Sequence, residues 1–320
     1  MLNEFNFFKV AMLDFFSACV ESQPGFIQLL IDAKNVQVIN INAEKEKAAR
    51  DLTKGEKEQN ERVSLVSGSG CLDPILRLLK ETKGKNLDEL HLATINFVLS
   101  LWMHCRVVAI SHLKTRDSFW TDLTWPLFEK SAAVTGTKGI ISAGIFRIIS
   151  SETYICGGKV DDGLMGVLEK FTEEKNNYFN MWCDVVLDSA GDTTVDAAND
   201  ASMFAKLRSY NKHHVLLAAW KSFLVVLTKD QPVTMSPVQC HAVSSKLIYT
   251  VKRLVSSTDR GDDDDDESRV LTSLAEFYLV LMQRWHTKCA DSMEKWCGEQ
   301  AELLEQVCNA TFKSTNFRRE

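Results

Sequence analysis

Apolar residues recur every three to four positions around "FFKVAMLDFFSACVESQPGFIQLL" (residues 7–30). Turned at about 100° per residue, they fall in one arc roughly 100° wide, which is typical of a helix face: Phe5, Phe8, Met12, Phe15, Phe16 and Cys19. Pro24 and Gly25 predict a sharp turn, followed by a second helix from Phe26. We interpret the stripe as the inner face of the first helix pair, so Phe15→Asp should unfold this end.

The helical period continues in segments separated by caps and breakers. N-caps are expected at Asp73, at Asn86 with Glu89 three residues later, and at Asp161. A break is expected before Pro126, within the helical segment at residues 116–131. The expected helices lie within residues 72–82, 86–114, 116–131, 137–155, 162–174, 176–190, 197–229, 238–257 and 268–310. Residues 197–229 are expected to form a helix pair or one long bent helix, and residues 268–310 one or two helices.

About twelve helical segments emerge, and the short β-rich runs at 36–41 and 223–227 are too isolated to form a sheet. No fixed-period repeat is present, but degenerate helix pairs of ~40 residues are typical of HEAT and armadillo arrays. We therefore predict an all-α fold, an α-solenoid of degenerate HEAT/armadillo-like helix pairs over residues 1–320. A charged surface insertion at about 42–70 and an acidic loop at about 259–268 are expected to interrupt it.

The charge and composition of the chain argue against nucleic acid and membrane as its binding partners. The net charge of −6 comes from the six carboxylates of residues 262–267, so the rest of the chain is neutral and lacks the basic stripe of a nucleic-acid-binding protein. The most apolar window, residues 94–113, contains Asn96, His104 and Arg106, which argues against insertion into a membrane. The chain also starts directly in an amphipathic helix, which predicts neither a signal nor a transit peptide.

Nine cysteines occur without a Cys-x-x-Cys pair, which predicts free thiols in a reducing compartment. Three adjacent pairs contain potential metal ligands, but neighbours on a helix point about 100° apart and do not chelate alone: His104–Cys105, His213–His214 and Cys240–His241. The glycines of "VSGSGC" and "ICGGKV" have neither Walker spacing nor a preceding strand. We predict no catalytic, cofactor-binding or metal-binding residues, no cofactor and no enzymatic activity.

One motif keeps an enzymatic alternative open. Asp262, Asp263 and Asp266 fit the Asp-Asp-x-x-Asp pattern that holds magnesium in all-α isoprenoid synthases. The run lacks apolar residues to hold it against a pocket wall, and its like charges resist helix formation. The second metal motif of that class needs Ser or Thr four residues after Asn199, where this chain has Met203. A solvated acidic loop is the favoured interpretation.

Four stretches of the chain together point to a known family. The first, "FFKVAMLDFFSACVESQPG" (7–25), is long and specific. The others are "FWTDLTWPLF" (119–128), "LLAAWKSFLVVL" (216–227) and "LVLMQRWHTK" (279–288). In this order they resemble stretches of the nucleoporin 188 family of large inner-ring scaffold nucleoporins. Residues 35–70 match nothing in the family.

The resemblance implies an interior fragment of a superhelical scaffold in the nuclear pore complex, at the nuclear envelope of the nucleus. The implied role is structural support of nucleocytoplasmic transport, including protein and mRNA transport. The implied partners are inner-ring and linker nucleoporins, and no binding residues are carried over. The main alternative is a transport-receptor-like helical array that binds Phe-Gly repeats; the magnesium-dependent isoprenoid synthase is the second.

Overall fold

The computed structural model of the chain describes most of the first 228 residues and scattered positions beyond them. The described residues are 2–23, 25–26, 30, 72–85, 87–129, 137–157, 159–191, 203–228, 236, 239–240, 242–247, 249–250, 274, 277–278, 301 and 305. Within these ranges every regular element is a helix, and none of these residues lies in a strand. The expected insertion at 42–70, the expected acidic loop at 259–268 and the β-rich run at 36–41 lie outside the described residues.

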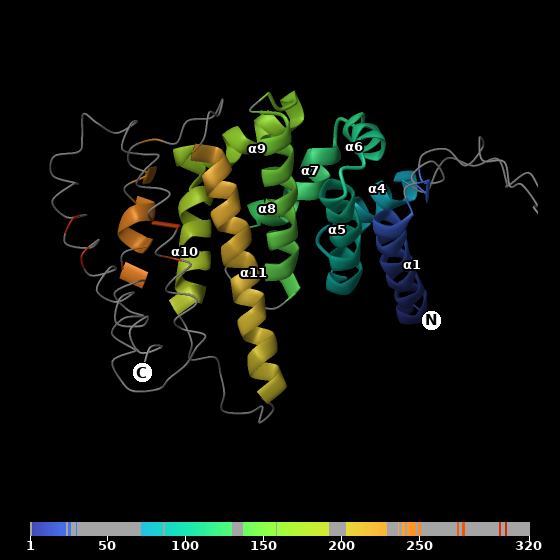
Figure 1. Ribbon diagram of the computed structural model, residues 1–320, viewed down its shortest axis with the longest axis horizontal. Coiled ribbons are helices and arrows are strands. Elements are labelled where there is room, and N and C mark those ends of the chain that lie inside the picture. Colours follow the sequence, from blue (N-terminus) through green and yellow to red (C-terminus); the bar gives the residue numbers. More distant parts are fainter. Residues whose placement is uncertain are drawn as a thin grey trace, which may run out of the picture.

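The helices are stacked along the long axis of the molecule, where α1, α5, α8 and α11 follow one another in sequence order (Figure 1). Their bounds are α1 (Leu2–Ser22), α4 (Leu72–Glu81), α5 (Asp88–Met103), α6 (Val107–Lys114), α7 (Phe119–Thr124), η2 (Trp125–Phe128), α8 (Thr137–Ile155), α9 (Asp162–Thr172), η3 (Glu174–Asn176), α10 (Tyr178–Gly191) and α11 (Met203–Thr228). The segment expected at 197–229 is one helix, α11, over the residues described there.

The helices form two rows. In one row α1 contacts α5, α5 contacts α8 and α8 contacts α11; in the other α4 contacts α7, α7 contacts α9 and α9 contacts α10. Contacts of α4 with α5 and of α10 with α11 join the rows. A stack of helix pairs in which each pair meets its neighbours is an α-solenoid, so the predicted fold class is confirmed.

The core runs continuously through this stack, and aromatic residues fill its centre. Phe146 of α8 lies at its middle, with ring centroids 5.1 Å from Trp182, 5.2 Å from Trp220 and 5.0 Å from Phe223. These rings come from α8, α10 and α11, and all are buried. Each large aromatic side chain buried in this way contributes ~2–3 kcal/mol through the hydrophobic effect.

Neighbouring helices of the first row approach closely and run in the same direction. Ile95 of α5 lies beside Gly144 of α8, where an added Cβ would come within 2.6 Å of its Cγ2 atom. Further along both helices, Trp102 is hydrogen-bonded to Glu152. Residue numbers therefore rise together along α5 and α8. This fits a superhelix of helix pairs in which equivalent helices of successive pairs lie in one row and run in the same direction.

Two local predictions are confirmed at the joint between α8 and α9. α8 ends at Ile155, and Gly157 follows with a φ of +55°, a conformation that glycine adopts without strain. Asp161 caps α9 as expected, since its carboxylate accepts a hydrogen bond of 2.9 Å from the Leu164 N–H. The helix expected to break before Pro126 also does so, because α7 ends at Thr124 and η2 contains the proline.

Other predictions about helix ends are wrong. α4 begins at Leu72, so Asp73 lies in its first turn, where it binds Arg116 at 2.6 Å instead of serving as the N-cap. The N-cap of α5 is Leu87, one residue later than expected, and it has no side-chain cap, while Asn86 lies outside the described residues. The single helix expected over 86–114 is broken between α5 and α6, where Cys105 takes a φ of +51°.

The interpretation of the first helix is also wrong. Phe5, Phe8, Met12 and Phe15 are exposed, and only Phe16 of the predicted inner face packs against the core. The face of α1 that meets α5 contains Leu13 and Val20, which are buried. α1 is apolar on two faces, and periodicity alone does not say which of them turns inward.

Candidate docking surface and buried polar network

The exposed aromatic residues of α1 form a continuous stripe. Phe5, Phe8, Met12 and Phe15 follow the i, i+3, i+4 spacing of one helix face, and the phenylalanines are 64%, 60% and 61% exposed. We call these four residues the α1 stripe. Soluble proteins rarely leave several large apolar side chains together in water, so such a patch is a candidate contact surface for another protein.

The side of α1 that faces α5 is held firmly against the array. Phe16 meets Phe97 of α5 in an edge-to-face contact, with ring centroids 6.4 Å apart. At the C-terminal end of the helix, Arg106 donates hydrogen bonds to the carbonyl oxygen of Val20. These contacts fix α1 while the α1 stripe remains free to meet a partner.

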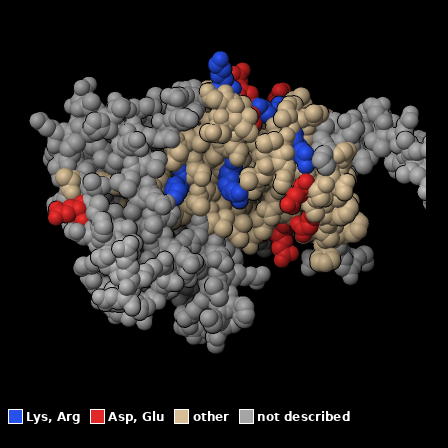
Figure 2. Space-filling model, in the orientation of Figure 1, with Lys and Arg blue, Asp and Glu red and all other residues tan. Residues whose placement is uncertain are grey.

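Charged side chains lie mainly at the edges of the visible face, including an acidic group next to α1 (Figure 2). Figure 2 shows few lysine, arginine, aspartate or glutamate side chains over the helices in the centre of this face. Near the stripe, Lys9 lies 5.0 Å from the centroid of the Phe5 ring and 3.8 Å from the carboxylate of Glu81. This surface suits an apolar partner better than a strongly charged one.

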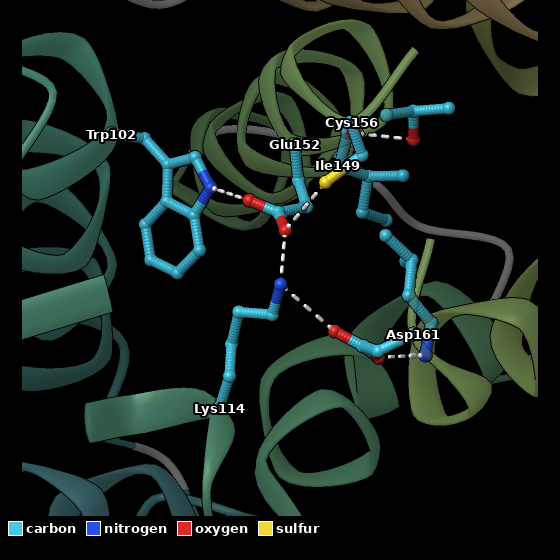
Figure 3. Close-up of polar contacts among 8 residues, drawn as sticks. Trp102, Lys114, Ile149, Glu152, Cys156 and Asp161 are labelled. Carbon is cyan, nitrogen blue, oxygen red and sulfur yellow. Dashed lines mark hydrogen bonds and ion pairs between the residues drawn. The ribbon is translucent and has the colours of Figure 1, made fainter. Parts of the chain in front are cut away.

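A second feature is a polar network inside the array (Figure 3). Glu152 of α8 is only 3% exposed, and its carboxylate accepts hydrogen bonds from Trp102 Nε1 of α5 at 2.9 Å and from Lys114 Nζ of α6 at 2.5 Å. The Cys156 thiol donates a third bond at 3.2 Å. Lys114 also forms an ion pair of 3.1 Å with Asp161, the N-cap of α9. The Glu152 network therefore connects α5, α6, α8 and α9.

The surroundings of Lys114, Asp161 and Cys156 in the network shift the pKa of each group. Burial lowers the pKa of Lys114, but hydrogen bonds to Glu152 and Asp161 outweigh it, so its pKa is raised and the amine is charged. Burial raises the pKa of Asp161, but hydrogen bonds from Leu164 N–H and Lys114 lower it below its usual value. Burial and the bond to Glu152 raise the pKa of Cys156 to about 11, so this thiol is a poor nucleophile.

Sequence reasoning missed this network, although α8 contains a signal for it. Glu152 follows Ile148 and Ile149 by four and three residues, so a lone carboxylate lies on the apolar face of the helix. A buried carboxylate needs a partner, and a cation elsewhere in the chain was to be expected. The sequence does not show that the partner is Lys114, which lies 38 residues away.

Candidate metal ligands do not come together in the described part of the chain. Among those residues, no group of three or more His, Cys, Asp or Glu side chains could hold a metal ion. His104 and Cys105 lie in the turn after α5, and the described cysteines 19, 105, 156 and 183 form no disulfide. The structure does not test the magnesium-site alternative, because its residues lie outside the described part of the chain: Asp262, Asp263, Asp266 and Asn199.

The length and hydropathy of the helices bear on whether any of them could span a membrane. Among the described residues, none of the helices is both long enough and apolar enough to cross a bilayer. The window at 94–113, the most apolar in the sequence, is divided between α5 and α6.

Comparison with known proteins gives consistent matches. No family model matches the chain. Nucleoporin NUP188 of Homo sapiens is 31% identical over 313 residues, which cover 94% of this chain and 16% of that protein. Nucleoporin NUP188 of Mus musculus is 28% identical over 310 residues, with the same two shares, and Nucleoporin Nup188 of Drosophila melanogaster is 26% identical over 305 residues, or 94% and 14%. The chain thus spans 12 to 16% of the length of the curated relatives it matches.

Proposed function

The chain belongs to the nucleoporin NUP188 family, and from this premise we propose that it is a non-enzymatic scaffold segment of the nuclear pore complex. It acts at the nuclear envelope, in the inner ring of the pore, and supports nucleocytoplasmic transport by holding other nucleoporins in place. The observation that carries the proposal is the match to NUP188 proteins along 94% of the chain.

The geometry supports this function. An α-solenoid offers a long surface and gains its stability from contacts between neighbouring helix pairs, so it does not need a closed catalytic pocket. The α1 stripe provides an apolar surface for contact with another nucleoporin. The Glu152 network, in contrast, has its charges paired with one another and its thiol poorly reactive, so it suits a structural role.

Affinity capture tests the proposal. The tagged chain is incubated with nuclear-envelope extract, washed at moderate salt, and the bound proteins are identified by mass spectrometry. We expect inner-ring or linker nucleoporins to be recovered, and a folded chain that recovers no nucleoporin would contradict the scaffold function.

A variant of the α1 stripe tests where the partner binds. Phe5→Ser, Phe8→Ser and Phe15→Ser together remove its exposed aromatic rings without touching buried residues. The matched control is Ala11→Ser with Ala18→Ser, at exposed positions of the same helix outside the stripe. Reduced recovery with the stripe variant alone would place the contact on α1, whereas equal recovery would move it elsewhere on the array.

Phe-Gly repeats are the second candidate partner, favoured by the same exposed aromatic residues. Phenylalanine side chains of such repeats could pack between Phe8, Met12 and Phe15. A titration of the chain with a Phe-Gly peptide, and with a Ser-Gly peptide of equal length, measures this binding. Saturable binding of the first peptide alone, lost in the stripe variant, would support transport-receptor-like behaviour.

A further inference from the structure

We propose that the Glu152 network fixes the register of α5 against α8, and so the geometry between consecutive helix pairs, rather than adding to the stability of the fold. Register here means the position of one helix along the axis of its neighbour. The inference concerns contacts within the chain, and it stands independently of the proposed function.

Apart from the close approach of Ile95 to Gly144, apolar packing specifies this register weakly. α5 and α8 both present rows of buried aliphatic residues to the core, among them Val98 on α5 and Ile145 and Ile149 on α8. Contacts between such side chains depend little on direction. A slide of one helical turn, ~5.4 Å, exchanges one aliphatic contact for another of similar kind.

The hydrogen bonds of Glu152 depend strongly on position. Its carboxylate is reached by Trp102 from α5 and by Lys114 from α6, at 2.9 and 2.5 Å. A slide of α8 by one turn would break both bonds and leave a charged carboxylate buried without its partners. Uncompensated buried charges are strongly unfavourable, so the network penalises every register but one.

The same network extends the constraint to the next helix. Lys114 binds Asp161 as well as Glu152, and Asp161 is the residue at which α9 begins. The position of α9 is therefore tied to that of α6, and the two consecutive helix pairs are joined by one set of directional contacts. The charges of Lys114 and Glu152 both lose hydration on burial, which offsets their mutual attraction. A role in specifying the helix register therefore accounts for the network better than a gain in stability does.

The central test replaces the ion pair with apolar side chains of similar length and measures register directly. Met103, at the exposed end of α5, and Lys138, at the opposite end of α8, are each replaced by an unnatural amino acid with a keto group. A nitroxide label is then attached to each keto group. The helices run in the same direction, so a slide changes the distance between the labels by most of its length. Pulsed electron resonance then gives the distance distribution for the parent and for Lys114→Met with Glu152→Met.

We expect a single narrow distribution in the parent and, in the double-methionine variant, an added component shifted by about one helical turn, ~5 Å. The variant should remain folded and unfold cooperatively in urea. An unchanged narrow distribution would overturn the proposal, since apolar packing would then suffice. Loss of cooperative unfolding would also overturn it, because the network would be needed for stability.

Two further variants separate register from other effects of substitution. Glu152→Gln keeps an oxygen that can accept from Trp102 and Lys114, so its distribution should stay narrow. Thr153→Val removes a buried hydroxyl of α8 that bonds only within its own helix, to the Ile149 carbonyl at 2.7 Å, and should also stay narrow. A broader distance distribution in Thr153→Val would show that removing any buried polar group from α8 changes the distance between the labels. The proposal would then fail.

Discussion

Arg106 reaches from the turn after α5 to the end of α1 and donates two hydrogen bonds to the Val20 carbonyl oxygen, at 3.0 Å from Nε and 2.5 Å from Nη2. The last carbonyl groups of a helix lack partners within it, and a guanidinium there satisfies them and complements the negative end of the helix dipole. One side chain thereby binds the first helix to the second helix of its row.

Removal of this cap should loosen α1 selectively. Arg106→Met is expected to lower the free energy of unfolding by ~1–2 kcal/mol, because a charged hydrogen bond to a partly buried carbonyl is lost. Hydrogen–deuterium exchange of the α1 amides should accelerate more than that of α8. Arg147→Met, at an exposed arginine that donates a hydrogen bond to the Met103 sulfur, is the matched control. Equal acceleration in both variants would contradict the capping role.

Gly144 marks the closest approach of α5 and α8. A Cβ at this position would lie 2.6 Å from Ile95 Cγ2, so Gly144→Ala should force the helices apart and cost ~1–3 kcal/mol. Gly166 lies in α9 with no atom within 4 Å of a built Cβ, so Gly166→Ala should stabilise the chain by ~0.5–1 kcal/mol. Urea unfolding of the two variants measures both effects, and the same sign for both would contradict the packing described here.

His91 should make the fold sensitive to acid. Its ring stacks on Trp125, with centroids 5.4 Å apart, and burial lowers its pKa from 6.5 to about 4, against a smaller opposing effect of Asp88. Between these values the unfolded chain binds a proton that the folded chain does not, so stability falls as the pH drops from 6.5 towards 4, by ~3 kcal/mol in total.

His91→Phe keeps an aromatic ring against Trp125 and removes the titrating group. Thermal melting of the parent and of this variant at pH 7.5, 6 and 5 measures the difference between them. The parent should lose more stability than the variant as the pH falls. Parallel curves would show that other groups carry the acid sensitivity.

The two faces of α1 predict opposite outcomes for neighbouring substitutions. Phe15→Asp, expected from the sequence to unfold this end of the chain, lies on the exposed side and should change the free energy of unfolding by less than about 0.5 kcal/mol. Leu13→Ala, on the buried side, should cost ~2–5 kcal/mol. Chemical denaturation distinguishes them, and a large loss from Phe15→Asp would restore the original interpretation.

The sequence predicts the helices well because their signals are local. The Asp161 cap, the break at Pro126 and the stop at Gly157 each depend on the chemistry of a few neighbouring residues. The fold class follows from helical periodicity without strands, since stacked amphipathic helices have few other ways to bury their apolar faces.

What the sequence does not predict depends on contacts between distant residues. α1 is apolar on two sides, so the choice between Leu13 and Phe15 as the inner residue is made by α5, more than 70 positions later. The partners of Glu152 are likewise set by how α5 and α6 pack on α8. Asn86 and Glu89 fit a capping box locally, yet the helix begins at Asp88.

The most direct test of the scaffold function is the location of the natural protein that contains this chain. A fluorescent tag is placed on the endogenous protein, and its position is compared by super-resolution imaging with that of a pore marker. For a pore scaffold we expect a punctate nuclear rim in which the tag coincides with the pores. A diffuse distribution in the cytoplasm or nucleoplasm, with no enrichment at the pores, would contradict it.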